Sequence, residues 1–595
     1  MIRLELYQEG IDEPLVPNLS PDFSMEIIRE NPLFALRGDY TYEIEISLRD
    51  SHNKKIYNHI ERLNSNEYPK NRKARIIYAG RVLCEGPEII LEKDGESVKI
   101  QILSSNSELN YLVADKNLRI REMDFGEIGE IDAETASSVA GSIYPEANFA
   151  FPMIYTDTER NRYRNIPSNS NLNTIVYDSS TQLMPCPYLL YYVERFVTLL
   201  GYRLIRNDLR DNDKWLRLII IHGYENTNKY SKLLPDWSAQ EFLEEIEKFF
   251  NCSILIDSIN RTAKIVDTNL HAQYTENIEI KRDEICDTFD VVKDKDDVVF
   301  LHDYRSIGYK LGESEFFKYA KINEETKKKC IYEKASPEQV LASNETDWKI
   351  FESTIDDFEF IKLVQTYNGY NGMRRVEQFK DYEAIEGNKT ELRISPAETM
   401  LGGPSLGWGQ GGQQLWSIAY ARIKKIAEDA DFRQYILDNA EKDETVEIMT
   451  VGFYGMIYGR LYYNNNTPYF NKGVVKRPSC FNYHYYPFVN NDDPDTGDTI
   501  PAYVKIYNID DSDFAGASRM TLELCGSGGR AETDYNSSIY ETNNEYRIKI
   551  KSKWVDPTSL YNINGRVFVC RQIKYKFSNG TMEPMMEGIF YPRIS

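Results

Sequence analysis

Residues 236–267 are the stretch whose sequence constrains its local fold most strongly. Ser238 and Glu241 have the spacing of a capping box, in which the hydroxyl accepts from an amide in the first turn and the carboxylate accepts from the cap residue's own amide. Four apolar residues then recur on one helical face: Phe242, Ile246, Phe249 and Phe250. Two short apolar runs follow, 253–257 and 263–266, with a polar turn between them. The segment predicts a helix and two strands, and it supplies no catalytic or metal-binding constellation.

Composition excludes several classes of protein. At 595 residues the chain is long enough for roughly four domains of ordinary size. Its 41% of hydrophobic residues provide several cores, which excludes a wholly disordered chain. The formal net charge is −22, from 93 acidic and 71 basic residues. This charge argues against a protein that holds nucleic acid by its phosphates or docks on an anionic membrane, because both need a basic surface.

The sequence lacks the signals of membrane insertion, secretion and metal binding by cysteine. No segment approaches the roughly 18 apolar residues that cross a bilayer. Arg3, Glu5 and Glu9 stand where a signal peptide needs an apolar core, so we expect a chain that folds in a cytoplasm. The eight cysteines show no two-residue spacing, and we expect them to be reduced and structural. They are Cys84, Cys186, Cys252, Cys286, Cys330, Cys480, Cys525 and Cys570.

The abundance of tyrosine favours strands. The chain has 43 tyrosines against 6 tryptophans, and aromatic residues make up 13% of it. Tyrosine suits a half-buried pleated surface because its ring packs while its hydroxyl stays in water. The composition therefore predicts a mainly β protein with broad contact surfaces.

Hydrophobic periodicity divides the chain into six segments. Alternating apolar residues predict strands in 1–105, around a short helix at 52–63. The other segments are an irregular connecting segment at 106–180, an α/β module at 181–270, a second β domain at 271–400, a helix-containing and loop-rich insertion at 401–545, and C-terminal strands at 546–595. Further helices are expected at 188–200, 337–342, 415–427 and 431–443, a strand at 215–221, and a turn at Asn564-Gly565. The fold class is thus mainly β and multidomain, with an inserted α/β module.

A glycine-rich stretch matches the dinucleotide-binding pattern G-x-G-x-x-G at Gly407, Gly409 and Gly412. That motif needs a buried strand immediately before it. Here 401–405 includes Pro404, which a central strand does not accommodate. A loop is the favoured interpretation.

Acidic residues around Gly497 resemble a calcium loop only in part. Asp492, Asp493, Asp495 and Asp498 supply carboxylates, but the glutamate that closes a twelve-residue loop is missing. A solvated hairpin tip is the favoured interpretation.

The histidines and carboxylates form no recognisable active site. No H-E-x-x-H pair occurs among His52, His59, His222, His271, His302 and His484. Acidic pairs such as Asp356-Asp357 and Asp510-Asp511 would serve as glycosidase carboxylates only if folding brought two of them to opposite sides of a sugar groove. We therefore assign no catalytic, cofactor-binding or metal-binding residue and expect no enzyme activity.

Six stretches together resemble the hub-type tail proteins of phages and prophages of Bacteroides-like bacteria. Three come from the middle of the chain: PCPYLLYYVERFVTLLGYRLI (185–205), WLRLIII (215–221) and PDWSAQEFLEEIEKFFNCSILIDSINRTAKIV (235–266). The others lie near the ends: DYTYEIEISLRDSHNKKIYNHIERLN (39–64), KARIIYAGRVLCEGPEIIL (73–91) and NGRVFVCRQIKYKFSNGTMEPMMEGIFY (564–591). The resemblance rests on pattern and order and covers about a third of the chain.

The resemblance implies a structural protein of the virion tail, assembled in the cytoplasm of the host bacterium. Such hubs are homotrimers that close the distal end of the tail tube, and each subunit contributes two tube-like β-barrel domains. Here 1–105 would be one barrel-like domain, and parts of 271–400 with the 546–595 strands would complete the other. The implied partners are tail tube or distal tail proteins and tail fibre or spike proteins, with DNA only in transit. The acidic composition agrees, because a basic channel would hold phosphates.

A carbohydrate-binding or glycan-degrading protein that acts on a bacterial surface polysaccharide is the alternative. In that case Tyr469, Tyr483, Tyr485 and Tyr486 would be stacking platforms for sugar rings, although packing between strands also explains them.

Overall fold

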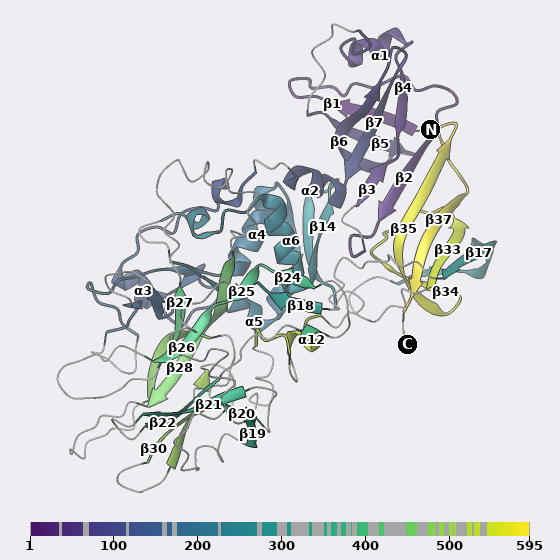
Figure 1. Ribbon diagram of the computed structural model, residues 1–595. Helices are drawn as coiled ribbons and strands as arrows, with labels where there is room; N and C mark the ends of the chain where they lie inside the picture. Colours follow the sequence, from purple (N-terminus) through teal and green to yellow (C-terminus); the bar gives the residue numbers. More distant parts are fainter. Residues whose placement is uncertain are drawn as a thin grey trace.

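The computed structural model describes a mainly β protein with an inserted α/β module (Figure 1). This confirms the expected fold class. The described residues are 2–34, 38–62, 71–114, 118–156, 163–168, 175–223, 228–269, 277–293, 306–310, 332–335, 350–353, 359–365, 370–375, 382–383, 389–402, 416–421, 448–460, 474–481, 487–492, 499–503, 505–506, 521–525, 529–535 and 544–593.

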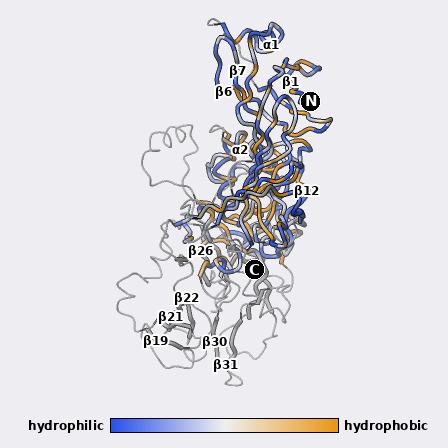
Figure 2. Tube along the Cα trace, turned by 90° about the vertical axis from the view of Figure 1, so that its right-hand side faces the viewer, coloured by the Kyte–Doolittle hydropathy of each residue, from blue (hydrophilic) through white to orange (hydrophobic). Residues whose placement is uncertain are grey.

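The N-terminal module is a curved wall of strands in the order β1-β5-β6-β7-β3-β2, with β4 also paired to β7. The strands are β1 (Ile2–Tyr7), β2 (Met25–Glu30), β3 (Asp39–Thr41), β4 (Ile44–Ser47), β5 (Lys73–Tyr78), β6 (Arg81–Lys93) and β7 (Ser97–Ser104). Buried residues alternate with exposed residues along β4 and with partly buried residues along most of β7, in the period of two that a strand imposes. Hydrophobic and hydrophilic positions accordingly alternate along this part of the chain (Figure 2).

The helix expected at 52–63 is shorter in the structure. Helix α1 spans Ser51–Ile56, and Asp50 caps it by accepting hydrogen bonds from two amides of the first turn. It ends because Asn58, with φ 52°, and the residue after it take left-handed conformations that a helix cannot continue. Leu63 lies outside the described residues.

The C-terminal strands form a second module together with two strands from the middle of the chain. These are β33 (Asn544–Lys551), β34 (Leu560–Ile563), β35 (Arg566–Ser578), β36 (Thr581–Met582), β37 (Met585–Pro592), β16 (Asn277–Ile280) and β17 (Ile285–Lys293). β16 pairs with β34, and β17 pairs with β33. The turn between β34 and β35 has φ 52° at Asn564 and 81° at Gly565, which confirms the turn predicted there.

The α/β module packs helices α4 and α6 beside a three-stranded sheet in the order β12-β15-β14 (Figure 1). Its elements are α4 (Leu189–Leu199), β12 (Arg203–Asn207), α5 (Asp213–Leu216), β13 (Leu218–Ile221), α6 (Ala239–Phe250), β14 (Cys252–Asp257) and β15 (Thr262–Asp267). The capping box of Ser238 and Glu241 is present, which confirms the predicted start of α6. Trp215, expected at the start of a strand, lies instead in the short helix α5.

Residues 106–180, expected to be irregular, contain two helices. The elements here are α2 (Asn106–Val113), η1 (Ile120–Glu122), α3 (Ala133–Ser138), β8 (Phe149–Ala150), β9 (Ile154–Thr156) and β10 (Tyr163–Arg164), and β11 (Cys186–Pro187) pairs with β8. Leu109 and Val113 of α2 are buried in the core of the α/β module. The segment therefore belongs to the packed core as well as connecting the modules.

The remaining strands of the described chain are mostly short. They are β18 (Ser306–Tyr309), β19 (Tyr332–Ala335), β20 (Ile350–Ser353), β21 (Glu359–Gln365), β22 (Tyr370–Arg375), β23 (Tyr382–Glu383), β24 (Thr390–Leu392), β25 (Ile394–Pro396), β26 (Glu398–Gly402), β27 (Trp416–Ala421), β28 (Met449–Arg460), β29 (Val474–Phe481), β30 (Pro487–Asp492), β31 (Thr499–Tyr503) and β32 (Lys505–Ile506). Three 3-10 turns, η2 (Asp208–Asp211), η3 (Tyr230–Leu233) and η4 (Arg282–Glu284), and helix α12 (Arg530–Thr533) complete the described elements.

The prediction of a helix at 415–427 is wrong for the first half of that segment. Trp416–Ala421 is strand β27, which pairs with β26 on one side and β9 on the other. The alternation of Trp416, Ile418 and Tyr420 fits this period of two, and β9 is too distant in sequence to be recognised as a partner. The rest of that segment, and the helices expected at 337–342 and 431–443, lie outside the described residues.

Candidate functional site

The two β modules share strand β35. Residues 572–577 of this strand pair with β2 of the N-terminal module, while residues 566–569 pair with β34 of the C-terminal module. Strand β37 pairs with residues 568–574 along the opposite edge of β35, so one 14-stranded sheet passes through both modules. A single apolar core accompanies the sheet and includes Ile2 at one end of the chain and Phe590 at the other. The modules are therefore joined by a sheet and a core, which is a rigid connection.

The turn after β35 also closes the wall of the N-terminal module. The Ile2 amide donates to the Gly580 carbonyl at 3.0 Å, and the Gly580 amide donates to the Phe23 carbonyl at 3.2 Å. The rings of Tyr78 and Phe577 meet edge to face, with centroids 5.6 Å apart, at the same seam. The last strands of the chain thus complete the wall that the first strands begin.

Buried polar groups fix the junction between the modules. Arg29 on β2 forms an ion pair with Asp39 on β3 at 3.0 Å, and its guanidinium lies 4.8 Å from the ring centroid of Trp554. The side-chain nitrogen of Asn31 donates to the carbonyl of Pro557 at 3.1 Å. Pro557 lies in the segment between β33 and β34. Burial raises the pKa of Asp39, although Arg29 opposes this shift. These contacts join segments more than 500 residues apart, as the 526-residue separation of Asn31 and Pro557 shows.

One exposed face of the shared sheet carries charges of both signs. Its cations are Arg547, Lys549 and Lys551 on β33, and Lys574 and Lys576 on β35. Cross-strand register places Glu587 of β37 opposite both Lys549 and Lys574, Glu26 of β2 opposite Lys576, and Asp290 of β17 opposite Arg547. Glu30 and Glu545 lie on the same side of β2 and β33, and Glu545 forms an ion pair with Arg547 at 2.8 Å. We call the surface formed by these residues the charged face; its acidic residues are as numerous as its cations.

A groove of about 570 Å³ lies at one end of the charged face. Its apolar lining comes from Tyr78, Ile285, Met582 and Met585, and its charged lining from Lys551 and the carboxylates Asp283, Glu284 and Glu583. The groove is therefore lined by apolar and acidic side chains together.

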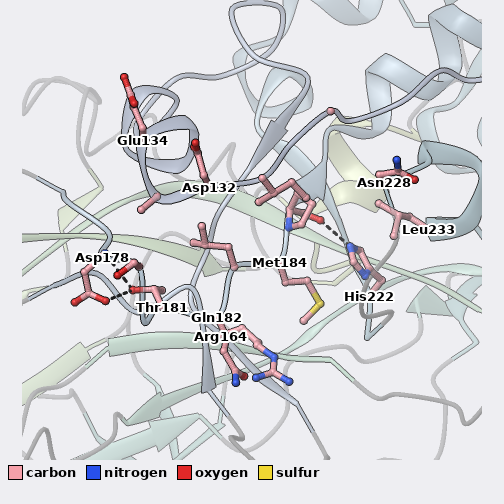
Figure 3. Close-up of a pocket in the computed structure, with 16 residues that line it drawn as sticks. Asp132, Glu134, Arg164, Asp178, Thr181, Gln182, Met184, His222, Asn228 and Leu233 are labelled. Atoms are coloured by element: carbon pink, nitrogen blue, oxygen red, sulfur yellow. Dashed lines mark hydrogen bonds between the residues drawn. The ribbon is translucent and has the colours of Figure 1, made fainter.

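A larger cavity of about 1040 Å³ lies against α3 and the segment before α4 (Figure 3). Its polar side chains serve local structure: Asp132 and Asp178 accept hydrogen bonds from amides of their own turns at 2.7 and 2.9 Å. Nε2 of His222 lies 2.7 Å from the Pro185 carbonyl oxygen, and burial lowers the pKa of His222 to about 4. Among its described lining residues there is no Tyr, Trp or Phe on which a sugar ring could stack. The cavity therefore gives the glycan alternative no support.

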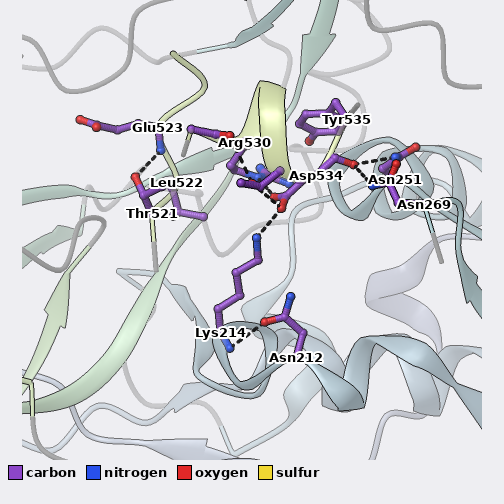
Figure 4. A network of polar contacts seen from close by, with 12 residues as sticks. Asn212, Lys214, Asn251, Asn269, Thr521, Leu522, Glu523, Arg530, Asp534 and Tyr535 are labelled. Atoms are coloured by element: carbon purple, nitrogen blue, oxygen red, sulfur yellow. Dashed lines mark hydrogen bonds and ion pairs between the residues drawn. The ribbon is translucent and has the colours of Figure 1, made fainter. Parts of the chain in front are cut away.

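A buried network of charges holds the segment around α12 on the α/β module (Figure 4). Asp534 forms ion pairs with both Lys214 of α5 and Arg530, the latter at 2.7 Å. Burial alone would raise the pKa of Asp534, but the two cations hold it below its ordinary value. Arg530 also donates to the Tyr309 hydroxyl at 2.8 Å and lies 4.2 Å above the Phe249 ring. The network joins four segments that are distant in sequence, and its arrangement indicates a structural role.

The three described histidines are each engaged locally. Nε2 of His52 lies 3.0 Å from the Val16 carbonyl oxygen, and Nδ1 of His59 lies 3.2 Å from Glu61. Within the described part of the chain, no three His, Cys, Asp or Glu side chains gather as a metal site. Six cysteines are described as free thiols, and five of these are buried: Cys84, Cys186, Cys252, Cys480 and Cys570.

Several sequence-based candidates lie outside the described residues. They are Gly407, Gly409, Gly412, Asp493, Asp495, Asp498, Tyr469, Tyr483, Tyr485, Tyr486, His271, His302 and His484, with the pairs Asp356-Asp357 and Asp510-Asp511. Asp492 is the last residue of strand β30. The charged face was not predicted, although the alternation R-I-K-I-K at 547–551 was a usable signal for cations on one side of a strand.

In the comparisons with known proteins, no family model and no curated protein matches the sequence. Among solved structures, the chain is similar to the 43 kDa tail protein of prophage MuSo2 from Shewanella oneidensis, with 7% identity, 99% of this chain and 96% of that chain covered, and a TM-score of 0.29. It is also similar to the tail protein from Neisseria meningitidis MC58, with 6% identity, 100% and 97% coverage, and a TM-score of 0.28. TM-scores of this size do not establish a shared fold, and no property of those proteins is carried over to this chain.

No helix in the described residues is both long enough and apolar enough to cross a lipid bilayer.

Proposed function

We propose that this chain is a structural tail hub or baseplate protein of a tailed bacteriophage, forming a ring at the distal end of the tail tube through which DNA passes. The observation that carries the proposal is the shared strand β35, which makes two β modules into one continuous wall. A ring built from such subunits receives two β modules from each of them. Three copies would thus present six similar units to a hexameric tube.

The sequence resemblance supports the same assignment. The 39–64 and 73–91 stretches that carry it fall on β3 to β6, and the 564–591 stretch falls on β35 to β37. In this proposal the partners are further copies of the chain, tail tube or distal tail proteins, and tail fibre or spike proteins. The protein acts by shape and contact, without catalysis, and resides in the virion tail after assembly in the host cytoplasm.

The net charge of −22 supports passage of DNA without retention. A channel wall rich in Lys and Arg would hold phosphates by releasing counterions, and a channel wall with few cations avoids this. We therefore expect the purified ring to bind double-stranded DNA only weakly at physiological salt.

The test is the native mass of the purified chain, measured by mass photometry and accompanied by negative-stain images. A trimer with a central channel is the expected result. A monomer at every protein concentration, both alone and with the tail tube protein of the same phage, would overturn the proposal. Tight binding or turnover in a glycan array and reducing-sugar assay would replace it with the polysaccharide-directed alternative.

A further inference from the structure

Strand β12 is an open edge of the sheet in the α/β module. The sheet order is β12-β15-β14, so β12, at the right-hand margin of Figure 2, pairs with β15 on one side and with no described strand on the other. The Arg203 amide donates to the Arg261 carbonyl at 2.9 Å, which directs the peptide groups of Arg203 toward β15. Because neighbouring residues of a strand direct their peptide groups to opposite edges, the N–H and C=O of Leu204 point to the open side. β12 therefore offers backbone hydrogen-bonding groups to a further strand.

The opposite edge of the same sheet is closed by a side chain. Asn106 of α2 donates from its side-chain nitrogen to the Ile254 carbonyl of β14 at 2.6 Å. Its side-chain oxygen accepts from the Ile256 amide at 3.0 Å. One amide side chain thus takes the place of a neighbouring strand along β14, and no strand of the described residues covers β12 in a comparable way.

A groove of about 670 Å³ lies beside the open edge. Glu194 and Thr198 of helix α4 line it, together with residues 201–205 and Asn207 of the segment that forms β12. A groove at an unpaired sheet edge is a place where an extended peptide can add as a further strand. In that mode of binding, hydrogen bonds to the main chain give affinity and contacts with alternate side chains give specificity.

The groove contains an exposed apolar side chain. Ile205 is 50% exposed, whereas its neighbour Leu204 packs against the core of the α/β module. An apolar side chain laid over Ile205 would remove its surface from water, which stabilises a complex.

The charge of the groove comes from Arg203. The two other charged residues of the lining neutralise each other, because Nε and Nη2 of Arg210 donate to the two carboxylate oxygens of Glu194, each at 2.5 Å. Arg203 is exposed and forms no ion pair with any residue that the structure describes. The groove therefore favours an occupant with an acidic residue near Arg203.

The charged neighbours of Arg203 leave it available. Arg206, further along β12, is paired with Asp208 at 2.6 Å. Asp257 lies in the same cross-strand row as Arg203, but β15 stands between them and Asn260 donates to the Asp257 carboxylate at 2.7 Å.

The irregularity of β12 limits what can pair with it. The strand has five residues, and its register with β15 shifts between Leu204 and Arg206. A short strand with a bulge is a poor partner for a long flat sheet edge. The occupant is therefore a short segment and not the edge of another sheet.

We propose that the groove between α4 and β12 binds a short extended segment of a partner protein as a fourth strand of this sheet. An apolar side chain of the segment covers Ile205, and an acidic one pairs with Arg203. The inference goes beyond the proposed function and does not depend on it, because one copy of the chain contains the whole groove.

The test uses the full chain and an array of acetylated and amidated synthetic hexapeptides, whose termini carry no charge. Every peptide alternates Val, Leu or Phe with Thr, and its first or last residue is Asp, Lys or Ser. Arg203→Glu reverses the charge of the groove, and Ile205→Asp removes its apolar contact. The matched controls are Lys55→Glu and Ile259→Asp, which change an exposed cation and a 42% exposed isoleucine elsewhere.

The measurement is the apparent dissociation constant of each peptide by fluorescence anisotropy, with circular dichroism to confirm folding. We expect peptides with a terminal Asp to bind at least about tenfold more tightly than those with Lys. Arg203→Glu should reverse this preference, which misfolding could not do. Ile205→Asp should weaken all the peptides at least about tenfold, and both controls should match the wild type.

Methylation of the backbone tests the added strand itself. A strand presents every second amide to its neighbour, so N-methylation of the best peptide should weaken binding at alternate positions and be tolerated at the others. Equal effects at all positions would overturn the proposal, as would an array in which no peptide binds or an Arg203→Glu variant that keeps the wild-type preference.

Two other results have separate meanings. If no peptide binds and Ile205→Asp lowers the native mass of the chain in mass photometry, the edge pairs with a second copy and the proposal is overturned. Failure of the peptides to bind a wild type that forms the trimeric ring would overturn this inference alone and leave the proposed function in place.

Discussion

Replacement of Asp534 by Asn tests whether the ion-pair network around α12 is shielded from water. The substitution keeps the size of the side chain but removes the negative charge between two cations. The exposed fractions of the Lys214, Asp534 and Arg530 side chains are 5%, 8% and 0%, so the charges left behind cannot reach water. Removal of one partner from a buried ion pair costs about 3–5 kcal/mol. We expect a loss of that size in the free energy of unfolding.

The backbone contacts of the same residue should survive the change. The side-chain nitrogens of Asn251 and Asn269 both donate to the backbone carbonyl of Asp534 at 2.6 Å, and neither bond involves the carboxylate. The loss in the free energy of unfolding would therefore come from removal of the charge, because the contacts that position the backbone remain. Lys214→Met in the Asp534→Asn background removes one of the two stranded cations and should restore part of the stability.

Trp215 provides the assay. Its ring is 2% exposed and its centroid lies 4.2 Å from Nζ of Lys214, so its fluorescence reports opening of the network. Urea unfolding is followed by tryptophan fluorescence. The Trp215→Phe variant identifies the part of that fluorescence that comes from Trp215. If the transition of Asp534→Asn coincides with that of the wild type, Lys214 and Arg530 are solvated and the reasoning is refuted. In the wild type the contribution is present above the ordinary pKa of Asp and is lost as pH falls through the lowered pKa of Asp534.

Four further substitutions have expected outcomes. Phe249→Ala should cost about 3–5 kcal/mol because the ring is fully buried, whereas Ser238→Ala should cost about 1 kcal/mol, and equal midpoints in thermal unfolding would contradict this difference. Burial raises the pKa of Glu247 from 4.5 to about 8, so the folded chain holds a proton there that the unfolded chain releases, and wild-type stability falls as pH rises through that window. Glu247→Gln should then gain stability relative to the wild type from pH 5 to pH 8, as measured by urea unfolding at each pH, and a constant difference would count against it. Gly86→Ala should disrupt pairing of β6 with β7, because the new Cβ would lie 1.7 Å from the Leu103 carbonyl oxygen; unchanged hydrogen-exchange protection in β7 would disprove this.

Local structure was predictable from the sequence where a short-range signal determines it. The capping box at Ser238 sets the start of α6, and the glycine at position 201, with φ 86°, follows the end of α4 as expected of a helix terminator. Helix α2 was missed because it has eight residues and its N-cap, Ser105, makes no side-chain capping bond. Strand β27 was misassigned because its partners come from distant segments, which a local pattern cannot reveal.

The candidate site was less predictable because it depends on long-range pairing. Nothing in the local sequence of β2 indicates that it pairs with residues 572–577. The same holds for Asp534, whose partner Lys214 lies 320 residues away. The charged face depends on both the alternation within β33 and the register with β35 and β37, and only the alternation is visible in the sequence.

The position of β35 has a consequence for how the protein is made. A ribosome releases β2 early, but the strand that pairs with its open edge emerges more than 500 residues later. The N-terminal module therefore cannot finish its wall, and its β2 edge stays unpaired, until residues 572–577 have been synthesised. A chain cut short before residue 566 lacks that strand and the turn that closes the seam to Ile2. A truncated chain would thus expose an open sheet edge that the chain synthesised through β35 covers.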